Sequence, residues 1–121
     1  MKRDINLIRK IILNIESSQY GFVNNNFQIE GYTREQIAYH CYLLIQGGLA
    51  EGITTTSVQS SSPAAVIRNL TWEGHEFADA ARNDSIWHQV SKVIKEKGES
   101  IAFPIITQLL ISEMKKNLGL T

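Results

Sequence analysis

The sequence predicts a mainly helical α+β domain with one β-hairpin, and three features indicate this class. Segments near both ends of the chain repeat apolar residues every three or four positions, which is the period of a helix with one buried face. Two short apolar segments, residues 49–53 and 66–70, flank a polar loop and favour a hairpin. A length of 121 residues with 43% apolar content fits one domain, residues 1–121, with one core.

The N-terminal elements follow from periodicity. The first helix is expected from Asp4 to Ser17, where isoleucines repeat on one face at positions 5, 8, 11, 12 and 15. Residues 18–26 are rich in Ser and Asn and predict a turn. Alternation over Phe27–Glu30 predicts a short strand, which Gly31 ends.

A second helix is predicted to begin after Thr33. Thr33 and Gln36 have the spacing of a capping box, in which each side chain accepts a hydrogen bond from the backbone of the other residue. This helix should end near Gly47-Gly48, because glycine adopts the left-handed conformation that closes helices. Its apolar stripe is Ile37, Cys41 and Leu44.

Helices are also expected after the hairpin. Thr71 can cap one helix and Asn83 another, so residues 72–97 form either one bent helix or two. Pro104 fits a first helical turn, which places a last helix from near Phe103 to about Asn117.

Apolar residues of the last helix cover more than one face, so part of its surface needs either the domain core or a second protein. In the first case the helix covers the first helix. In the second it binds a twin subunit or a host protein. The candidate interface residues are Trp87, Ile106, Leu110, Met114 and Leu118.

Composition limits the classes of partner. Twelve basic and twelve acidic residues balance, so the chain lacks the uniform positive field of non-specific DNA or membrane binders. No apolar run reaches the ~18 residues of a membrane span, and no signal-peptide core follows the charged start. A single cysteine agrees with a reducing compartment. We therefore expect a cytoplasmic protein without membrane contact.

The predicted order of elements is the plan of a winged helix-turn-helix, with the 54–65 loop as its wing. Residues 1–82 form that part, and residues 83–121 add C-terminal helices. The segment Tyr42–Gly52 resembles the "L-x-x-x-G-L-I" step of winged-helix proteins, and Leu70–Phe77 resembles their "L-T-x-x-G-x-x-F" step. In the second step Thr71 caps a helix while Gly74 allows close packing on the strand.

Over nearly its whole length the chain resembles a family of small bacterial and phage proteins described as a domain of unknown function. The resemblance is carried by Met1–Asp4 with Leu7–Lys10, Gly31–His40, Leu70–Ala81 and the helix of Trp87. A YjcQ-like winged helix is the next nearest resemblance. The resemblance implies a phage or prophage origin and no particular reaction. One departure is that residues 18–30 are too short and polar for a full second helix.

Sequence-specific binding of double-stranded DNA is one functional hypothesis. It places Arg34, Gln36, Tyr39 and His40 on the exposed side of the capped helix, in a major groove. Charge opposes it, because residues 34–83 hold three arginines against five acidic residues. The wing from Gly52 to Ile67 contains no Lys or Arg.

Catalytic and metal-binding patterns are weak. His75 and Asp79 lie one helical turn apart, as in zinc proteases, but the second histidine of that motif is missing. His40 and Cys41 are adjacent and point about 100° apart on a helix, so they cannot form a nucleophile and base pair. Cys41 is expected in the core. We expect no enzyme activity, cofactor or metal.

The favoured interpretation is a non-enzymatic winged-helix binding protein that acts through protein–protein contact, with a homodimer or a host protein as the partner. A DNA-binding transcriptional regulator is the alternative.

Overall fold

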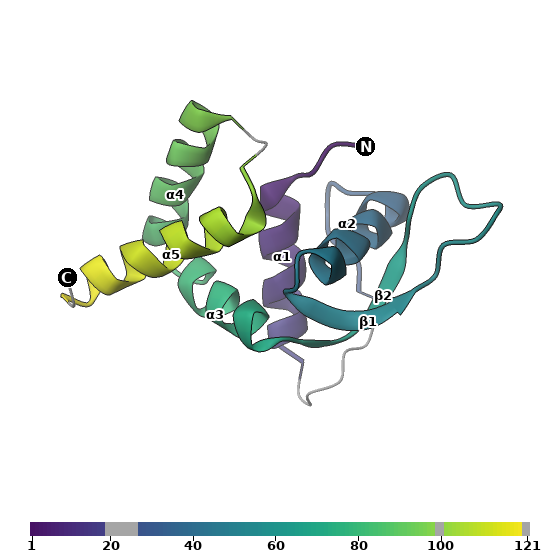
Figure 1. Ribbon diagram of the computed structural model, residues 1–121, viewed down its shortest axis with the longest axis horizontal. Helices are drawn as coiled ribbons and strands as arrows, with labels where there is room; N and C mark the ends of the chain where they lie inside the picture. The colour runs from purple at the N-terminus through teal and green to yellow at the C-terminus, as the bar shows by residue number, and fades with distance from the viewer. Residues whose placement is uncertain (19–26, 99–100, 120–121) are drawn as a thin grey trace. The chain divides into compact units, whose positions relative to one another are not determined.

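The computed structural model describes residues 1–18, 27–98 and 101–119. Within these residues the fold is mixed α+β, with five helices and one antiparallel two-stranded hairpin (Figure 1). They form two compact units, residues 1–75 and 76–121. The single domain expected over residues 1–121 stays a prediction. The elements are α1 (Ile5–Glu16), α2 (Arg34–Gln46), β1 (Ala50–Thr54), β2 (Ala65–Leu70), α3 (Trp72–Ala81), α4 (Asp84–Lys97) and α5 (Phe103–Asn117).

The core of the first unit is built on α1, which packs against α2 and β2. The predicted isoleucine stripe is buried from Ile8 to Ile15, and Leu7, which the periodicity did not mark, is also fully buried. Helix α2 contacts both strands and buries Leu44, while β2 buries Ile67. The apolar period therefore located the helices correctly and slightly underestimated the width of the buried face.

The strand predicted over Phe27–Glu30 is wrong. The backbone there is irregular, and the Ile29 carbonyl accepts a hydrogen bond from the Tyr32 N–H at 3.2 Å, which makes a turn. Phe27 and Ile29 are half-buried, whereas Gln28 and Glu30 are exposed. The alternation of apolar and polar residues therefore predicted which side chains are buried. Alternate burial does not, however, require the segment to pair as a strand. Of the predicted 18–26 turn, residues 19–26 lie outside the described part of the chain.

The predicted capping box of α2 is confirmed. The Gln36 N–H donates to Thr33 Oγ1 at 3.1 Å, and the Thr33 N–H donates to Gln36 Oε1 at 2.8 Å. The helix ends at Gly47, and Gly48 takes a φ of +77°, the left-handed value that glycine supplies at helix ends.

The hairpin is confirmed as an antiparallel pair that runs from Ala50 opposite Leu70 to Thr54 opposite Ala65. A register shift after Glu51 leaves Arg68 as an extra residue in β2. The loop between the strands projects from the end of the hairpin (Figure 1), and its residues 59–62 line a hollow together with Arg34, Glu35 and Ala38 of α2.

The link from the hairpin into α3 depends on Thr71 and Gly74. Thr71 Oγ1 accepts from the Gly74 N–H at 3.1 Å and donates to the Gly48 carbonyl at 2.6 Å. A Cβ added to Gly74 would overlap the backbone carbonyl of Leu49. The expected cap and the expected close approach of Gly74 are both present.

Residues 72–97 form two helices, of which α3 begins in the first unit and α4 lies in the second. The Asn83 side chain accepts from the Ile86 N–H at 3.0 Å and starts α4. Phe77 and Trp87 pack edge to face, with ring centroids 6.1 Å apart. Helix α4 packs against α5, which begins with Pro104 in its first turn as predicted.

No helix in the described part of the chain combines the length and the apolar character needed to cross a membrane.

Replacement of Gly74 by Ala should destabilise the fold more than replacement of Gly48. The Gly74→Ala methyl meets rigid backbone, and overpacking of this kind costs ~1–3 kcal/mol or more. The Gly48→Ala methyl meets nothing within 4 Å and adds only the left-handed strain of ~1–2 kcal/mol. Urea unfolding of both variants measures the difference, and an equal or reversed ranking would contradict the close approach.

Candidate binding surfaces around the capped helix

The four side chains predicted to contact DNA do not share one exposed face. Arg34 is exposed, and Tyr39 is half-buried with its ring stacked on Tyr42, centroids 6.3 Å apart. The amide oxygen of Gln36 is bound within the capping box. His40 is only 1% exposed, so its predicted position on the exposed side of α2 is wrong. Helical spacing alone places His40 beside Cys41, at the edge of the apolar stripe, and the structure turns that edge inward.

His40 joins α2 to the start of α1. Its Nε2 accepts a hydrogen bond from the backbone N–H of Asp4 at 2.8 Å, and its Nδ1 lies 2.7 Å from the Gln36 carbonyl. Because an N–H can only donate and a carbonyl can only accept, these partners assign a neutral ring with the proton on Nδ1. Burial lowers the pKa of His40, while the Gln36 carbonyl and the Asp4 charge act in the opposite direction.

Asp4 serves three segments at once. Its Oδ1 caps α1 by accepting from the N–H groups of Asn6 at 2.9 Å and Leu7 at 3.2 Å. Its Oδ2 accepts from the hydroxyl of Tyr32 at 3.0 Å. Burial raises the pKa of Tyr32, and the hydrogen bond to Asp4 and its charge add to this. We call Asp4, Tyr32 and His40 the Asp4 junction.

The Asp4 junction was not recognised from sequence. An Asp directly before an apolar-periodic segment is a helix-start signal, so the N-cap role of Asp4 was visible. The bonds to Tyr32 and His40 join residues 28 and 36 positions away and leave no local pattern.

A cavity of about 710 Å³ lies beside the junction. Its walls come from residues 27–32, the first half of α2 and the start of β2, with Thr55 on the hairpin. The apolar lining includes Phe27, Ile29, Ile37, Ala38, Cys41, Ala65 and Val66. Burial raises the pKa of the Cys41 thiol to about 12, so this thiol is neutral at physiological pH. The expected core position of Cys41 is confirmed.

The hairpin exposes large apolar side chains on its outer face. Ile53 and Val66 are opposite residues of β1 and β2 and are both exposed, at 69% and 40%. Residues directly opposite in an antiparallel pair have their side chains on the same face. Val58, in the connecting loop, is also fully exposed. We call Ile53, Val58 and Val66 the hairpin patch.

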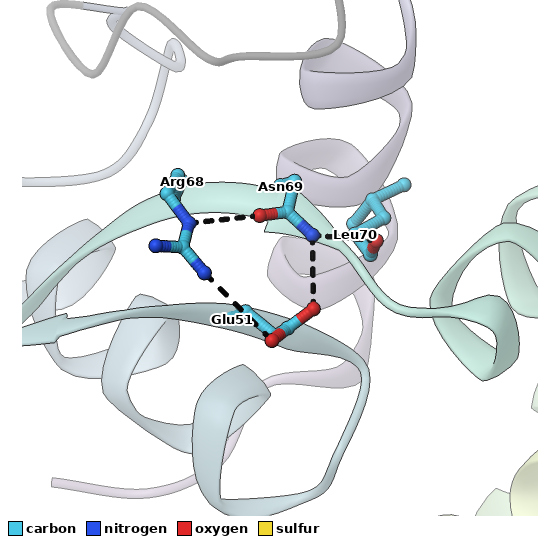
Figure 2. Close-up of polar contacts among 4 residues, drawn as sticks. All are labelled: Glu51, Arg68, Asn69 and Leu70. Atoms are coloured by element: carbon cyan, nitrogen blue, oxygen red, sulfur yellow. Dashed lines mark hydrogen bonds and ion pairs between the residues drawn. The ribbon is translucent and has the colours of Figure 1, made fainter.

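Arg68 is the basic residue of β2, and its side chain is paired with other residues of the hairpin. Its guanidinium lies 3.8 Å from a Glu51 carboxylate oxygen and donates through Nε to the Asn69 amide oxygen at 3.1 Å (Figure 2). The Asn69 amide nitrogen donates to the other Glu51 oxygen at 3.1 Å. Because Arg68 is the extra residue in β2, the side chains of Arg68 and Asn69 both reach the Glu51 carboxylate. The charge of Arg68 is therefore matched locally.

The five predicted interface residues differ in exposure, and their assignment to an interface stays a prediction. Trp87, Ile106 and Leu110 are buried, because α4 and α5 pack together and Trp87 packs on Phe77. Met114 is half-buried, and Leu118 is 63% exposed. The α5 stripe is therefore partly buried, at Ile106 and Leu110, and Ile105 and Leu118 are its exposed large apolar residues.

The histidine and aspartate that resembled a zinc motif do not converge with other ligands. His75 and Asp79 are exposed, and Asp79 accepts from the Arg82 guanidinium at 3.0 Å. Among the described residues, no cluster of three or more His, Cys, Asp or Glu side chains could hold a metal ion.

Two comparisons with known proteins match most of the chain. A family model described as "Hypothetical protein (DUF2513)" matches residues 2–100. A protein of Haemophilus influenzae, titled "Uncharacterized protein", is 36% identical over 120 residues, which cover 94% of this chain and 98% of that protein. No solved structure matches the chain at a significant level.

The buried His40 should make stability depend on pH. Because its pKa in the fold is lowered from 6.5, the unfolded chain binds more protons as pH falls below that value. The stability is therefore complete above pH 6.5 and is lost as pH decreases toward the lowered pKa. We expect urea midpoints to fall between pH 7.5 and pH 5.5.

The His40→Gln variant tests the assignment. It should lose ~1–3 kcal/mol at pH 7.5 by disturbing a buried hydrogen-bond pair, and it should show a flatter pH dependence. The matched control is His88→Gln, at an exposed histidine of α4. An unchanged slope in His40→Gln would show that another group controls the pH dependence.

Proposed function

The chain belongs to the family described as hypothetical protein (DUF2513), and we propose that it is a non-enzymatic winged-helix binding protein that acts through contact with another protein. The winged-helix assignment is supported by the order of α1, α2 and the β1–β2 hairpin, with the hairpin as the wing. The hairpin patch is the observation that carries the proposal of protein contact.

A wing that binds DNA places basic side chains against phosphates. This wing has no Lys or Arg from Gly52 to Ile67, and it exposes Ile53 beside Val66. Adjacent exposed apolar side chains are typical of surfaces that bind other proteins. The charge of the nearby Arg68 is matched by Glu51, so the face as a whole favours an apolar protein surface over a polyanion.

The DNA-binding alternative retains Arg34 and Tyr39 as candidate contacts. It has less support because the ring of His40 and the amide oxygen of Gln36 already serve hydrogen bonds within the fold. Direct reading of bases needs free donors and acceptors on the helix that enters the groove.

Site-specific photo-crosslinking in living cells tests the protein-contact proposal. A photoreactive aromatic residue at position 53 should give a discrete adduct, whereas the same residue at exposed position 89 of α4 should give none. An adduct of twice the chain mass identifies a second copy, and any other mass identifies a different protein. Val66→Lys should reduce the adduct at least several-fold by placing a charge in the contact. Absence of an adduct at position 53 would contradict the proposal.

A gel-shift series with double-stranded DNA separates the two candidate functions. If the protein acts by protein contact, duplex DNA should not shift even at ~50 mM salt. The wing from Gly52 to Ile67 lacks the Lys and Arg side chains whose contacts with phosphates release counterions from DNA. Under DNA binding, a shift appears, falls steeply with added salt and weakens in Arg34→Ala. That second pattern would replace the protein-contact proposal.

A further inference from the structure

The cavity beside the Asp4 junction has the size and lining of a small-molecule site. Its volume of about 710 Å³ lies within the ~300–1,000 Å³ typical of ligand pockets. Its lining includes Ile37, Ala38 and Cys41 of α2 together with Phe27 and Ile29. Such a lining favours an apolar ligand body.

Two opposite charges belong to the same cavity. Glu30 and Arg34 both line it and are exposed, so they lie at its open side. Within residues 1–18, 27–98 and 101–119 neither side chain has an ion pair or hydrogen bond. Lys10, which lies near the same segment, is placed over the Tyr32 ring at 5.5 Å.

The remaining polar side chains that line the cavity are Gln28, Tyr32, Cys41 and Thr55, and none of them carries a charge at neutral pH. The Tyr32 hydroxyl donates to Asp4, and the thiol of Cys41 is neutral. A ligand charge at the cavity mouth therefore meets Glu30 and Arg34 first.

We propose that this cavity binds a small zwitterion with an apolar body, whose carboxylate pairs with Arg34, whose ammonium pairs with Glu30 and whose side chain contacts Ile37 and Ala38. Arg34 suits a carboxylate because the guanidinium can donate two parallel hydrogen bonds. A purely anionic ligand would meet repulsion from Glu30, and a cation would meet repulsion from Arg34. An uncharged ligand would cover part of the mouth and leave both charges unpaired.

A free apolar α-amino acid and a short apolar peptide with free ends share this chemistry. They differ in the separation of ammonium and carboxylate, so a direct comparison identifies the source. The charged residues of this site lie on the 27–34 segment and not on the hairpin patch, and Val66 is the one residue that belongs to both the cavity lining and the patch.

Titration of the isotope-labelled full chain, followed by amide NMR shifts, tests the proposal. The probes are leucine, phenylalanine, the dipeptide Leu-Leu and the doubly capped N-acetyl-leucine amide. We expect shifts over residues 27–38 with at least one zwitterionic probe, and binding at least tenfold weaker for the capped compound. Saturation by leucine or phenylalanine indicates an amino acid, whereas saturation by Leu-Leu alone indicates a peptide.

Charge-neutral variants locate the two ends of the ligand. Glu30→Gln and Arg34→Gln should each weaken binding about tenfold, since each removes one charge-assisted contact at an exposed mouth. The matched controls are Glu73→Gln and Arg82→Gln, at exposed positions outside the cavity, which should bind as the parent does. Ala38→Leu should also weaken binding by filling the cavity.

The proposal is overturned if no zwitterionic probe shifts residues 27–38, or if the capped compound binds as tightly as leucine. It is also overturned if Glu30→Gln and Arg34→Gln bind as the two controls do.

Discussion

The arrangement of the first unit depends on one carboxylate residue, Asp4. Its backbone N–H donates to His40 of α2, and one carboxylate oxygen caps α1. The other carboxylate oxygen accepts from the Tyr32 hydroxyl. Buried polar groups of this kind are costly unless every partner is present, so the Asp4 junction fixes one relative position of these three segments. Tyr32 lines the cavity and donates a hydrogen bond to Asp4, so the cavity wall is coupled to the N-cap of α1.

Positive and negative charges balance both over the whole chain and on the hairpin. The chain balances twelve basic against twelve acidic residues, and on the hairpin the same balance appears as Arg68 facing Glu51. Exposed pairs of this kind contribute little to stability. Here the pair removes net charge from a face that also exposes Ile53 and Val66. Under the proposed protein contact, such a face would select its partner by shape and apolar contact.

Local signals in the sequence were sufficient for most of the fold. Periodicity located α1, the Thr33 box located the start of α2, and the Asn83 cap separated α3 from α4. Burial was harder to predict, because the same helical spacing describes a stripe that faces the core and one that faces a partner. Ile106 and Leu110 were assigned to an interface for this reason, and His40 to a DNA contact. Which helix face is covered depends on tertiary packing, which local sequence does not show. For His40 the covering contact is a hydrogen bond from Asp4, a residue 36 positions away.

The wrong strand prediction and the cavity have the same physical origin. Neighbouring strands in a sheet lie ~4.8 Å apart, which leaves no space between their backbones. Had residues 27–30 paired with β2, the space lined by Phe27, Ile29, Ala65 and Val66 would have closed. Instead a turn held by the Ile29 carbonyl and the Tyr32 N–H moves this segment out of the sheet and leaves Glu30 at the cavity mouth. The backbone that would have added a third strand to the sheet thus supplies a wall and a charge to the cavity, so that strand pairing at this edge and an open cavity exclude each other.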